Sequence, residues 1–266
     1  MTKNKQINDL LSHNQTSWDK QAEEQHEWSR PVSREEVDLA KQGRWQVHLT
    51  PSPCPINWLG DIKGKRILCL ASAGGQQAPI LSAAGAKVTV FDLSKKQLEQ
   101  DQNVAQRDHL DLITVQGDMA DLSVFDDRSF DLIFHPISNL YVPDVRKVWQ
   151  ECYRVLAEDG RLLSGFYNPV VYIHDKDPIY HEQGVIKPRY KLPYSDLKDL
   201  PAEMLDQKRN KGEAFVFGHS LTDLIAGQID AGFSINGFYE DEQPKPRFLI
   251  DLVIPTFLAT YATKGI

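Results

Sequence analysis

The residues with the clearest chemical potential begin with a run of small side chains, ASAGGQQ, that follows the apolar segment RILCLA at 66–71. Small residues let a ligand approach the backbone, and the amides of a following helix present positive charge to an anionic group. The run therefore predicts a ligand-binding loop, although glycine-rich turns also occur for structural reasons. The residues assigned to it are Ala71, Ser72, Ala73, Gly74, Gly75 and Gln77.

An acidic residue, Asp92, follows the next apolar segment, KVTVF at 87–91. A carboxylate there supplies two acceptors for the two hydroxyls of a ribose. The alternative is that Asp92 caps the following helix, a role that Ser94 could equally fill. Because the small-residue loop lies upstream, we favour the ribose role, and we assign Leu93 and Gln97 to the same site.

A third candidate, Gly117-Asp118-Met119, follows the apolar segment at 112–115. The Asp118 carboxylate can accept a hydrogen bond from an adenine amine, and the Met119 side chain can lie on the ring face. Gly-Asp is also a common turn, so the tripeptide alone indicates little. As the third such site in a series, it favours a nucleoside ligand.

The segments that must position these residues alternate between strand and helix patterns. The expected strands are 66–71, 87–91, 112–115, 130–134 and 161–166, and the expected helices are 77–84, 94–107 and 143–157. Such alternation predicts right-handed βαβ units and a parallel sheet covered on both faces. The carboxyl ends of its strands meet at one edge, where open α/β sheets bind ligands. A helix at 220–231 and two closing strands at 233–239 and 255–263 follow.

Two further regions lie outside this rhythm. Residues 1–60 form a predicted N-terminal arm or lid, with a frayed terminus to about Gln15 and a Ser33-x-x-Glu36 capping box that opens a helix. Trp18, Trp28 and Trp45 suggest packing, either of a docked arm or of a lid over a ligand. Residues 167–218 are too long for a plain connection and predict an insertion within the ligand-binding domain, 61–266.

Composition narrows the partners. The 266-residue chain has a net charge of −7 and no long Lys/Arg block, so a nucleic-acid partner is not expected. It has no apolar run near membrane-spanning length, so no membrane span is expected. Its three cysteines lack pairing or ligand spacing, which predicts neither disulfides nor a metal site and fits the cytoplasm.

The sheet-edge site admits both NAD and S-adenosylmethionine. A dinucleotide fingerprint requires G-x-G-x-x-G to seat a pyrophosphate, and ASAGGQQ does not supply it. Two consecutive closing strands also suit a different topology from that of the dinucleotide-binding fold.

An ordered set of motifs resembles the class I S-adenosylmethionine-dependent methyltransferases, in their small-molecule branch. The motifs are LCLASAGGQQ, VTVFDLS, QGDM, FDLIFHPIS, VRKVWQECYRVLAEDGRLL and PTFLATYATK. The resemblance implies a Rossmann-like seven-stranded α/β sheet of order 3-2-1-4-5-7-6, with strand 7 antiparallel. It also implies S-adenosylmethionine as cofactor and a small-molecule methyl acceptor.

The chain departs from the family at three positions. Cys69 stands where the family usually has an acid, and Ala71 and Ala73 stand where it has glycines. Gln77 or backbone carbonyls are then candidate partners for the methionine amino group.

The best candidate for a general base is His135, directly after FDLIF, because its reference pKa is near neutral and it should face the methyl-donor end of the pocket. Asn139, Tyr141, Tyr167 and Asn168 could line an acceptor pocket. The alternatives to an enzyme of this kind are a non-catalytic cofactor-binding module and an NAD-linked oxidoreductase.

Overall fold

The computed structural model describes residues 3–265 and contains a seven-stranded sheet of order β3-β2-β1-β4-β5-β9-β8. The strands are β1 (Arg66–Leu70), β2 (Lys87–Asp92), β3 (Leu112–Gln116), β4 (Phe130–His135), β5 (Leu156–Tyr167), β8 (Phe233–Asp241) and β9 (Phe257–Lys264). The neighbours from β3 to β5 pair in parallel, whereas β9 is antiparallel to both β5 and β8. Since β8 and β9 are the sixth and seventh strands of the sheet, the predicted order and the antiparallel last strand are confirmed.

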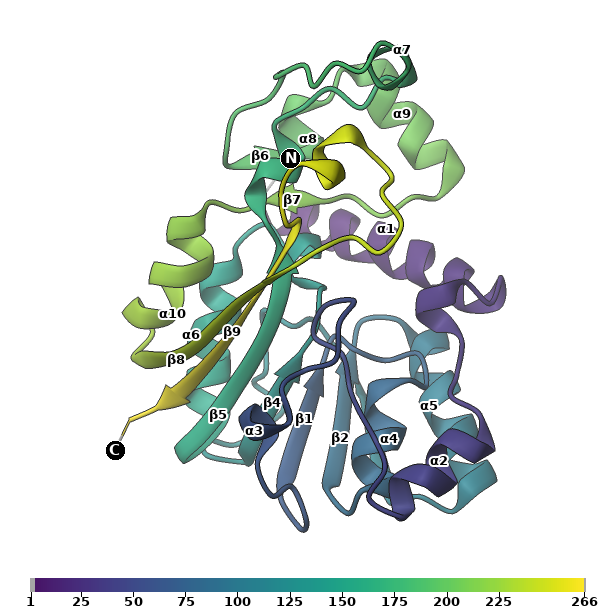
Figure 1. The fold of residues 1–266 in the computed structure, drawn as a ribbon, viewed down its shortest axis with the longest axis vertical. Coiled ribbons are helices and arrows are strands. Elements are labelled where there is room, and N and C mark those ends of the chain that lie inside the picture. The colour runs from purple at the N-terminus through teal and green to yellow at the C-terminus, as the bar shows by residue number, and fades with distance from the viewer. Residues whose placement is uncertain (1–2, 266) are drawn as a thin grey trace.

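Helices cover both faces of this sheet (Figure 1). The helices outside the insertion include α1 (Lys3–Glu23), α2 (Arg34–Lys41), α3 (Ile56–Leu59), α4 (Gln77–Ala83), α5 (Lys95–Asp108), α6 (Val145–Val155) and the short α10 (Gly227–Asp230). One core cluster joins the sheet to α4 and α5 through residues such as Leu81 and Leu98. The other joins its opposite face to α6 through Val148 and Trp149. Strands buried on both faces explain the near-continuous apolar runs from which they were predicted.

The predicted frayed terminus is wrong for the residues that the structure describes, because α1 extends from Lys3 to Glu23; Met1 and Thr2 lie outside them. The helix carries a mostly polar sequence and is held by contacts with distant parts of the chain. Leu10 packs against Phe215 and Phe217 in a small buried cluster. The helix propensity of residues 1–15 does not reveal these distant contacts, so a helix was not predicted there from the sequence alone.

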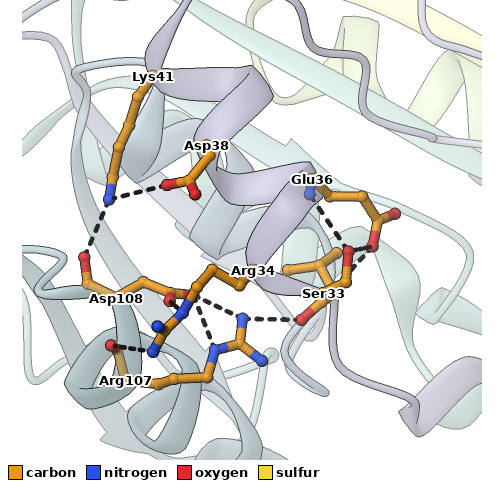
Figure 2. Close-up of polar contacts among 8 residues, drawn as sticks. Ser33, Arg34, Glu36, Asp38, Lys41, Arg107 and Asp108 are labelled. Atoms are coloured by element: carbon orange, nitrogen blue, oxygen red, sulfur yellow. Dashed lines mark hydrogen bonds and ion pairs between the residues drawn. The ribbon is translucent and has the colours of Figure 1, made fainter.

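The predicted capping box is confirmed and helps to dock α2 on the end of α5 (Figure 2). The Ser33 Oγ accepts from the Glu36 N–H at 3.2 Å, and the Ser33 N–H donates to the Glu36 carboxylate at 2.7 Å. From the same helix, Arg34 pairs with the buried carboxylate of Asp108 at 3.2 Å, and Lys41 donates to the Asp108 carbonyl. The arm is therefore fixed to the domain at α2.

Two element boundaries differ from those predicted. The chain passes directly from α6 into β5 at Leu156, so the strand begins five residues before the predicted 161 and follows a register shift opposite β4. The predicted helix at 220–231 contains a π-helical turn, η4 (Thr222–Ala226), before α10. Neither difference could be predicted, because the spacing of apolar residues shows neither where a strand begins nor that a helix contains a π-helical turn.

The insertion after β5 forms an upper lobe above the carboxyl edge of the sheet (Figure 1). Its elements are η3 (Pro169–Tyr172), α7 (Pro178–Glu182), β6 (Tyr194–Ser195), α8 (Asp196–Asp199), α9 (Ala202–Lys211) and β7 (Phe217–Gly218). Strands β6 and β7 make a separate two-stranded sheet. Through Phe215 and Phe217 the lobe also packs on α1, so arm and insertion form one continuous cover.

Candidate active site

A cavity of about 200 Å³ lies where the cover meets the carboxyl ends of β1 to β5. It brings together nine of the predicted site residues: Ala71, Ser72, Ala73, Gln77, Asp92, Leu93, Gln97, Asp118 and Met119. Three others, Gly74, Gly75 and His135, do not line it. The series of strand-end sites therefore converges along one edge of the sheet.

The small-residue loop turns sharply as it leaves β1. Ala71 has a φ of 46°, and Gly74 and Gly75 have φ values of 118° and 74°, all in the region that favours glycine. Two carboxylates hold the loop amides: the Ala73 N–H donates to Asp92 Oδ2 at 3.2 Å, and the Gly74 N–H donates to Asp101 Oδ2 at 2.9 Å. The loop is thus fixed by acids from β2 and α5.

The two glycines of the loop contact the N-terminal arm instead of the cavity. A Cβ at Gly74 would lie 3.0 Å from the Trp28 carbonyl oxygen, and one at Gly75 would lie 2.9 Å from Pro31 Cβ. The Val32 N–H donates to the Gly75 carbonyl at 2.8 Å. Close contacts with the arm and with the Gln97 side chain therefore require the small size of both glycines, which the sequence analysis had assigned to ligand binding.

Asp92 presents its carboxylate to the cavity from the end of β2. Its Oδ1 accepts from the Ser94 N–H at 2.9 Å, whereas the cap of α5 is Ser94 itself, whose Oγ accepts from Gln97 N–H. The capping alternative for Asp92 is therefore wrong. Burial raises the pKa of Asp92 to about 6, and the backbone hydrogen bonds from Ser94 and Ala73 oppose that rise.

Asp118 follows β3 and borders the same cavity. Its Oδ1 accepts from the Ala120 N–H at 3.0 Å, and burial raises its pKa. The adjacent Met119 side chain is 9% exposed and packs on the core beneath. An acceptor and an apolar surface therefore lie side by side, as an adenine ring requires.

Sequence reasoning missed Asp101, a fully buried acid on α5. Among the described residues its Oδ1 has no hydrogen-bond partner, and burial raises its pKa to about 7. It lies close to Cys69, whose thiol pKa is raised first by burial and further by Asp101. The available signal was the helix pattern, because Asp101 shares the buried face of α5 with Leu98 and Val104.

His135 does not face the cavity, so its predicted position is wrong. The ring is fully buried at the end of β4, beside Trp149, and its Nδ1 lies 2.9 Å from the Leu70 carbonyl oxygen. Burial lowers its pKa to about 4. Because successive side chains of a strand point to opposite faces, the His135 side chain lies on the α6 face of the sheet. Pro136, Ile137 and Ser138 line the cavity instead.

Aromatic residues from four segments also line the cavity. Trp18 of α1 meets Tyr141 edge-on with ring centroids 5.2 Å apart, and Tyr167 lies 4.9 Å from Phe257. Of the four residues predicted for an acceptor pocket, Tyr141 and Tyr167 line the cavity and the two asparagines do not. The Asn139 and Asn168 amides donate instead to the carbonyls of Gly165 and Pro255.

The tryptophans of the arm divide between the two roles considered for them. Trp18 and Trp28 line the cavity, whereas Trp45 packs against the core. Gln97 connects cavity and arm, since its Nε2 donates to Trp18 O at 3.2 Å and to Ser29 Oγ. The arm therefore both docks on the domain and forms a wall of the site.

The donor and acceptor set fits an adenosyl amino acid. Partly accessible carboxylates at Asp92 and Asp118 suit ribose hydroxyls and an adenine amine, and Met119 suits a ring face. The sheet order and this rim together define an α/β protein with a site suited to a nucleoside ligand.

Comparison with known proteins specifies the class. Residues 68–164 match the sequence pattern of the family described as "Methyltransferase domain". The protein described as "Uncharacterized methyltransferase YbaJ" of Bacillus subtilis (strain 168) is 49% identical over 259 residues, covering 97% of this chain and 100% of the relative. The chain therefore belongs to the class I S-adenosylmethionine-dependent methyltransferases, and S-adenosylmethionine is its cofactor.

Solved structures show the same fold. An S-adenosylmethionine-dependent methyltransferase from Mesorhizobium loti superposes with a TM-score of 0.60 at 20% identity, over 79% of this chain and 95% of that one. The 1,6-didemethyltoxoflavin-N1-methyltransferase of Burkholderia thailandensis has a TM-score of 0.58 at 14% identity, over 97% and 90%. Within residues 3–265, no helix combines the length and apolar character that crossing a bilayer requires.

Proposed function

We propose that this methyltransferase transfers the methyl group of S-adenosylmethionine to a small-molecule acceptor. The observation that carries the proposal is that the site is covered. The arm, including α1, and the insertion lie over the rim, and Trp18, Tyr141, Tyr167 and Phe257 line the cavity beneath them. A covered, aromatic cavity of about 200 Å³ suits a small acceptor better than a polymer.

The residues of the rim have distinct roles in this proposal. Asp92 accepts the ribose hydroxyls, while Asp118 and Met119 hold the adenine. The segment Ala71–Ala73 and Gln77 border the methionine end, with Leu93 and Gln97 completing the wall. Gly74 and Gly75 support the arm, and His135 has no catalytic role because its ring is sealed from the cavity.

The protein's contribution to the reaction is alignment and exclusion of water. S-adenosylmethionine, when bound, supplies a methyl group that is already activated for displacement. Holding an acceptor in line with that methyl can lower the barrier by up to ~7–11 kcal/mol in favourable cases. Trp18 and Trp28 close the cavity from the arm and Tyr167 closes it from β5, which keeps solvent away from the reacting atoms.

We also propose that the acceptor is not a nucleic acid and that the protein works in the cytoplasm; the net charge and the cysteines support these two points. A net charge of −7 opposes a nucleic-acid acceptor. Cys54, Cys69 and Cys152 are all free and buried, as expected of a protein in a reducing compartment such as the cytoplasm.

The test is formation of S-adenosylhomocysteine from S-adenosylmethionine when the purified protein is mixed with separated cell fractions: small metabolites, RNA and proteins. We expect product only with the metabolite fraction. Asp92→Ala should weaken S-adenosylhomocysteine binding about 100-fold by calorimetry, because two charge-assisted hydrogen bonds of ~1.5 kcal/mol each are lost. Asp126→Ala, which removes an exposed carboxylate, is the matched control.

Three results would contradict the proposal in different ways. Product with RNA or protein alone would overturn the small-molecule acceptor. Tight cofactor binding without turnover in any fraction would favour a non-catalytic module. Unchanged affinity in Asp92→Ala would remove the ribose assignment.

A further inference from the structure

A loop of the N-terminal arm, residues 47–54, inserts into the wall of the cavity. Within it, His48 and Pro53 form an antiparallel bridge, and the Cys54 N–H donates to the Val47 carbonyl at 2.7 Å. His48, Leu49, Thr50 and Pro51 line the cavity. The loop therefore supplies side chains to the site from outside the motif-bearing domain.

Three anchors fix the position of the 47–54 loop. Its tip is held by Asp241 at the end of β8, which accepts from Thr50 Oγ1 and from the Ser52 N–H, both at 2.7 Å. Its middle lies against β5, where a Cβ at Gly165 would stand 2.1 Å from the Leu49 carbonyl oxygen. Its start is tied to the rim, because the His48 N–H donates to Gln77 Oε1 at 2.8 Å.

The third anchor links the 47–54 loop to the cofactor side of the cavity. Gln77 is the first residue of α4 and itself lines the cavity. A side chain on the rim thus sets the backbone position of His48. Such fixation is required of a catalytic group, because misplacement by about 1 Å can cost on the order of 100-fold in rate.

The surroundings of the His48 ring select one neutral tautomer. Its Nδ1 lies 3.0 Å from the Pro51 carbonyl oxygen, which can only accept a hydrogen bond. Nδ1 therefore carries the hydrogen, and Nε2 has a free lone pair. No group within residues 3–265 forms a hydrogen bond with Nε2, and His48 is a half-buried residue that lines the cavity. A base oriented by an acceptor at its other nitrogen is the arrangement that proton abstraction needs.

Other histidines near the site lack this combination. His135 is sealed on the opposite face of β4, and His219 is occupied by the Asn139 carbonyl at 3.0 Å. His174 lies in the upper lobe and does not line the cavity. Burial raises the pKa of Tyr141, so its phenol stays protonated near neutral pH and is not available to accept a proton.

We propose that His48 Nε2 receives the proton of the methyl acceptor. This inference rests on the proposed function and adds a substrate class: the acceptor bears its nucleophile as an O–H or N–H group. The acceptor's lone pair forms the new bond to the methyl carbon, the carbon–sulfur bond breaks with its electron pair going to sulfur, and the O–H or N–H proton moves to Nε2. The imidazolium then releases that proton to water.

The first test reads the tautomer without requiring turnover. Long-range ¹H–¹⁵N spectra of the full chain labelled with ¹⁵N-histidine, with bound S-adenosylhomocysteine, should show His48 protonated at Nδ1 and bare at Nε2. His48→Asn identifies the signal, and its side-chain amide can still donate to the Pro51 carbonyl. A hydrogen on Nε2 of neutral His48 would overturn the proposal, whatever the activity.

The second test separates base from cofactor ligand. His48→Asn and His48→Gln should bind S-adenosylhomocysteine within about twofold of wild type, yet form it from S-adenosylmethionine and the metabolite fraction about 100-fold more slowly. The loss should appear in kcat, since the group acts in the transition state. His181→Asn, an exposed histidine of α7, is the control.

The two proposals fail by different observations. Wild-type rates in His48→Asn would overturn the role of His48 while leaving methyl transfer to a small molecule intact. No turnover by the wild-type protein in the metabolite fraction would contradict the proposed function, and the tautomer would still report whether His48 is arranged as a base.

Discussion

The rim and the cover of this cavity are built in opposite ways. The rim is formed at the ends of β1, β2 and β3 by residues near one another in sequence, such as Ala73 and Asp92. The cover joins segments far apart in the chain: Asn14 of α1 exchanges hydrogen bonds with the Phe215 backbone at 2.8 Å and 3.1 Å. One region is specified locally, and the other depends on long-range packing.

The difference corresponds to a division of chemical tasks. Binding the adenosyl group requires hydrogen-bond acceptors at the strand ends, and short motifs place them there. Selecting the methyl acceptor requires side chains that enclose the cavity, and these come from the arm and the insertion. In this chain, the residue best arranged to move a proton, His48, belongs to the cover.

The largest effect is expected from the buried acid that stabilises the rim. Folding raises the pKa of Asp101 from 3.8 to about 7. The stability associated with its protonated form is complete below pH 4 and is lost as pH rises through 7. Because one pKa unit corresponds to about 1.4 kcal/mol, this loss is about 4 kcal/mol between pH 4 and 8. Asp101→Asn cannot ionise, so it should gain stability relative to wild type as pH rises.

Urea unfolding of both proteins at pH 4 and pH 8 measures this difference. Asp92, with a pKa of about 6, titrates in both proteins, and because its charge helps to raise the pKa of Asp101 the measured difference includes the coupling of the two acids. Asp126→Asn is the control, because its carboxylate is exposed. Parallel pH dependence in Asp101→Asn and wild type would show that the acid is not buried behind the loop as described.

The extent of successful sequence prediction follows the same boundary. The strand-end positions of Asp92 and Asp118 and the cap at Ser33 depend on short local patterns and were predictable from them, whereas the sheet order came from the family resemblance. The helix α1 was not, because its stability comes from partners about 200 residues away. The orientation of His135 failed for a narrower reason: a one-residue alternation at the end of β4 decides which face a side chain takes.

A smaller effect should arise where cover and rim meet, at Gly165. An alanine there places its Cβ against the Leu49 carbonyl, a backbone atom that cannot rotate away. Gly165→Ala should therefore lower the free energy of unfolding by about 2 kcal/mol and displace the 47–54 loop. Gly265→Ala, whose added Cβ meets nothing, is the control for urea denaturation. Unchanged stability would indicate that the loop does not rest on β5.

The smallest effect is expected at Trp28, which distinguishes a wall of the site from a docked arm. Its side chain is 51% exposed and borders the cavity, so Trp28→Ala should change unfolding by less than about 0.5 kcal/mol. Loss of its contact with a bound nucleoside should still weaken S-adenosylhomocysteine binding about fivefold, or about 1 kcal/mol. Trp45→Ala, which removes a side chain packed on the core, should show the reverse pattern. If calorimetry finds Trp28→Ala unchanged in affinity but reduced in stability, the arm stabilises the domain without contacting the ligand.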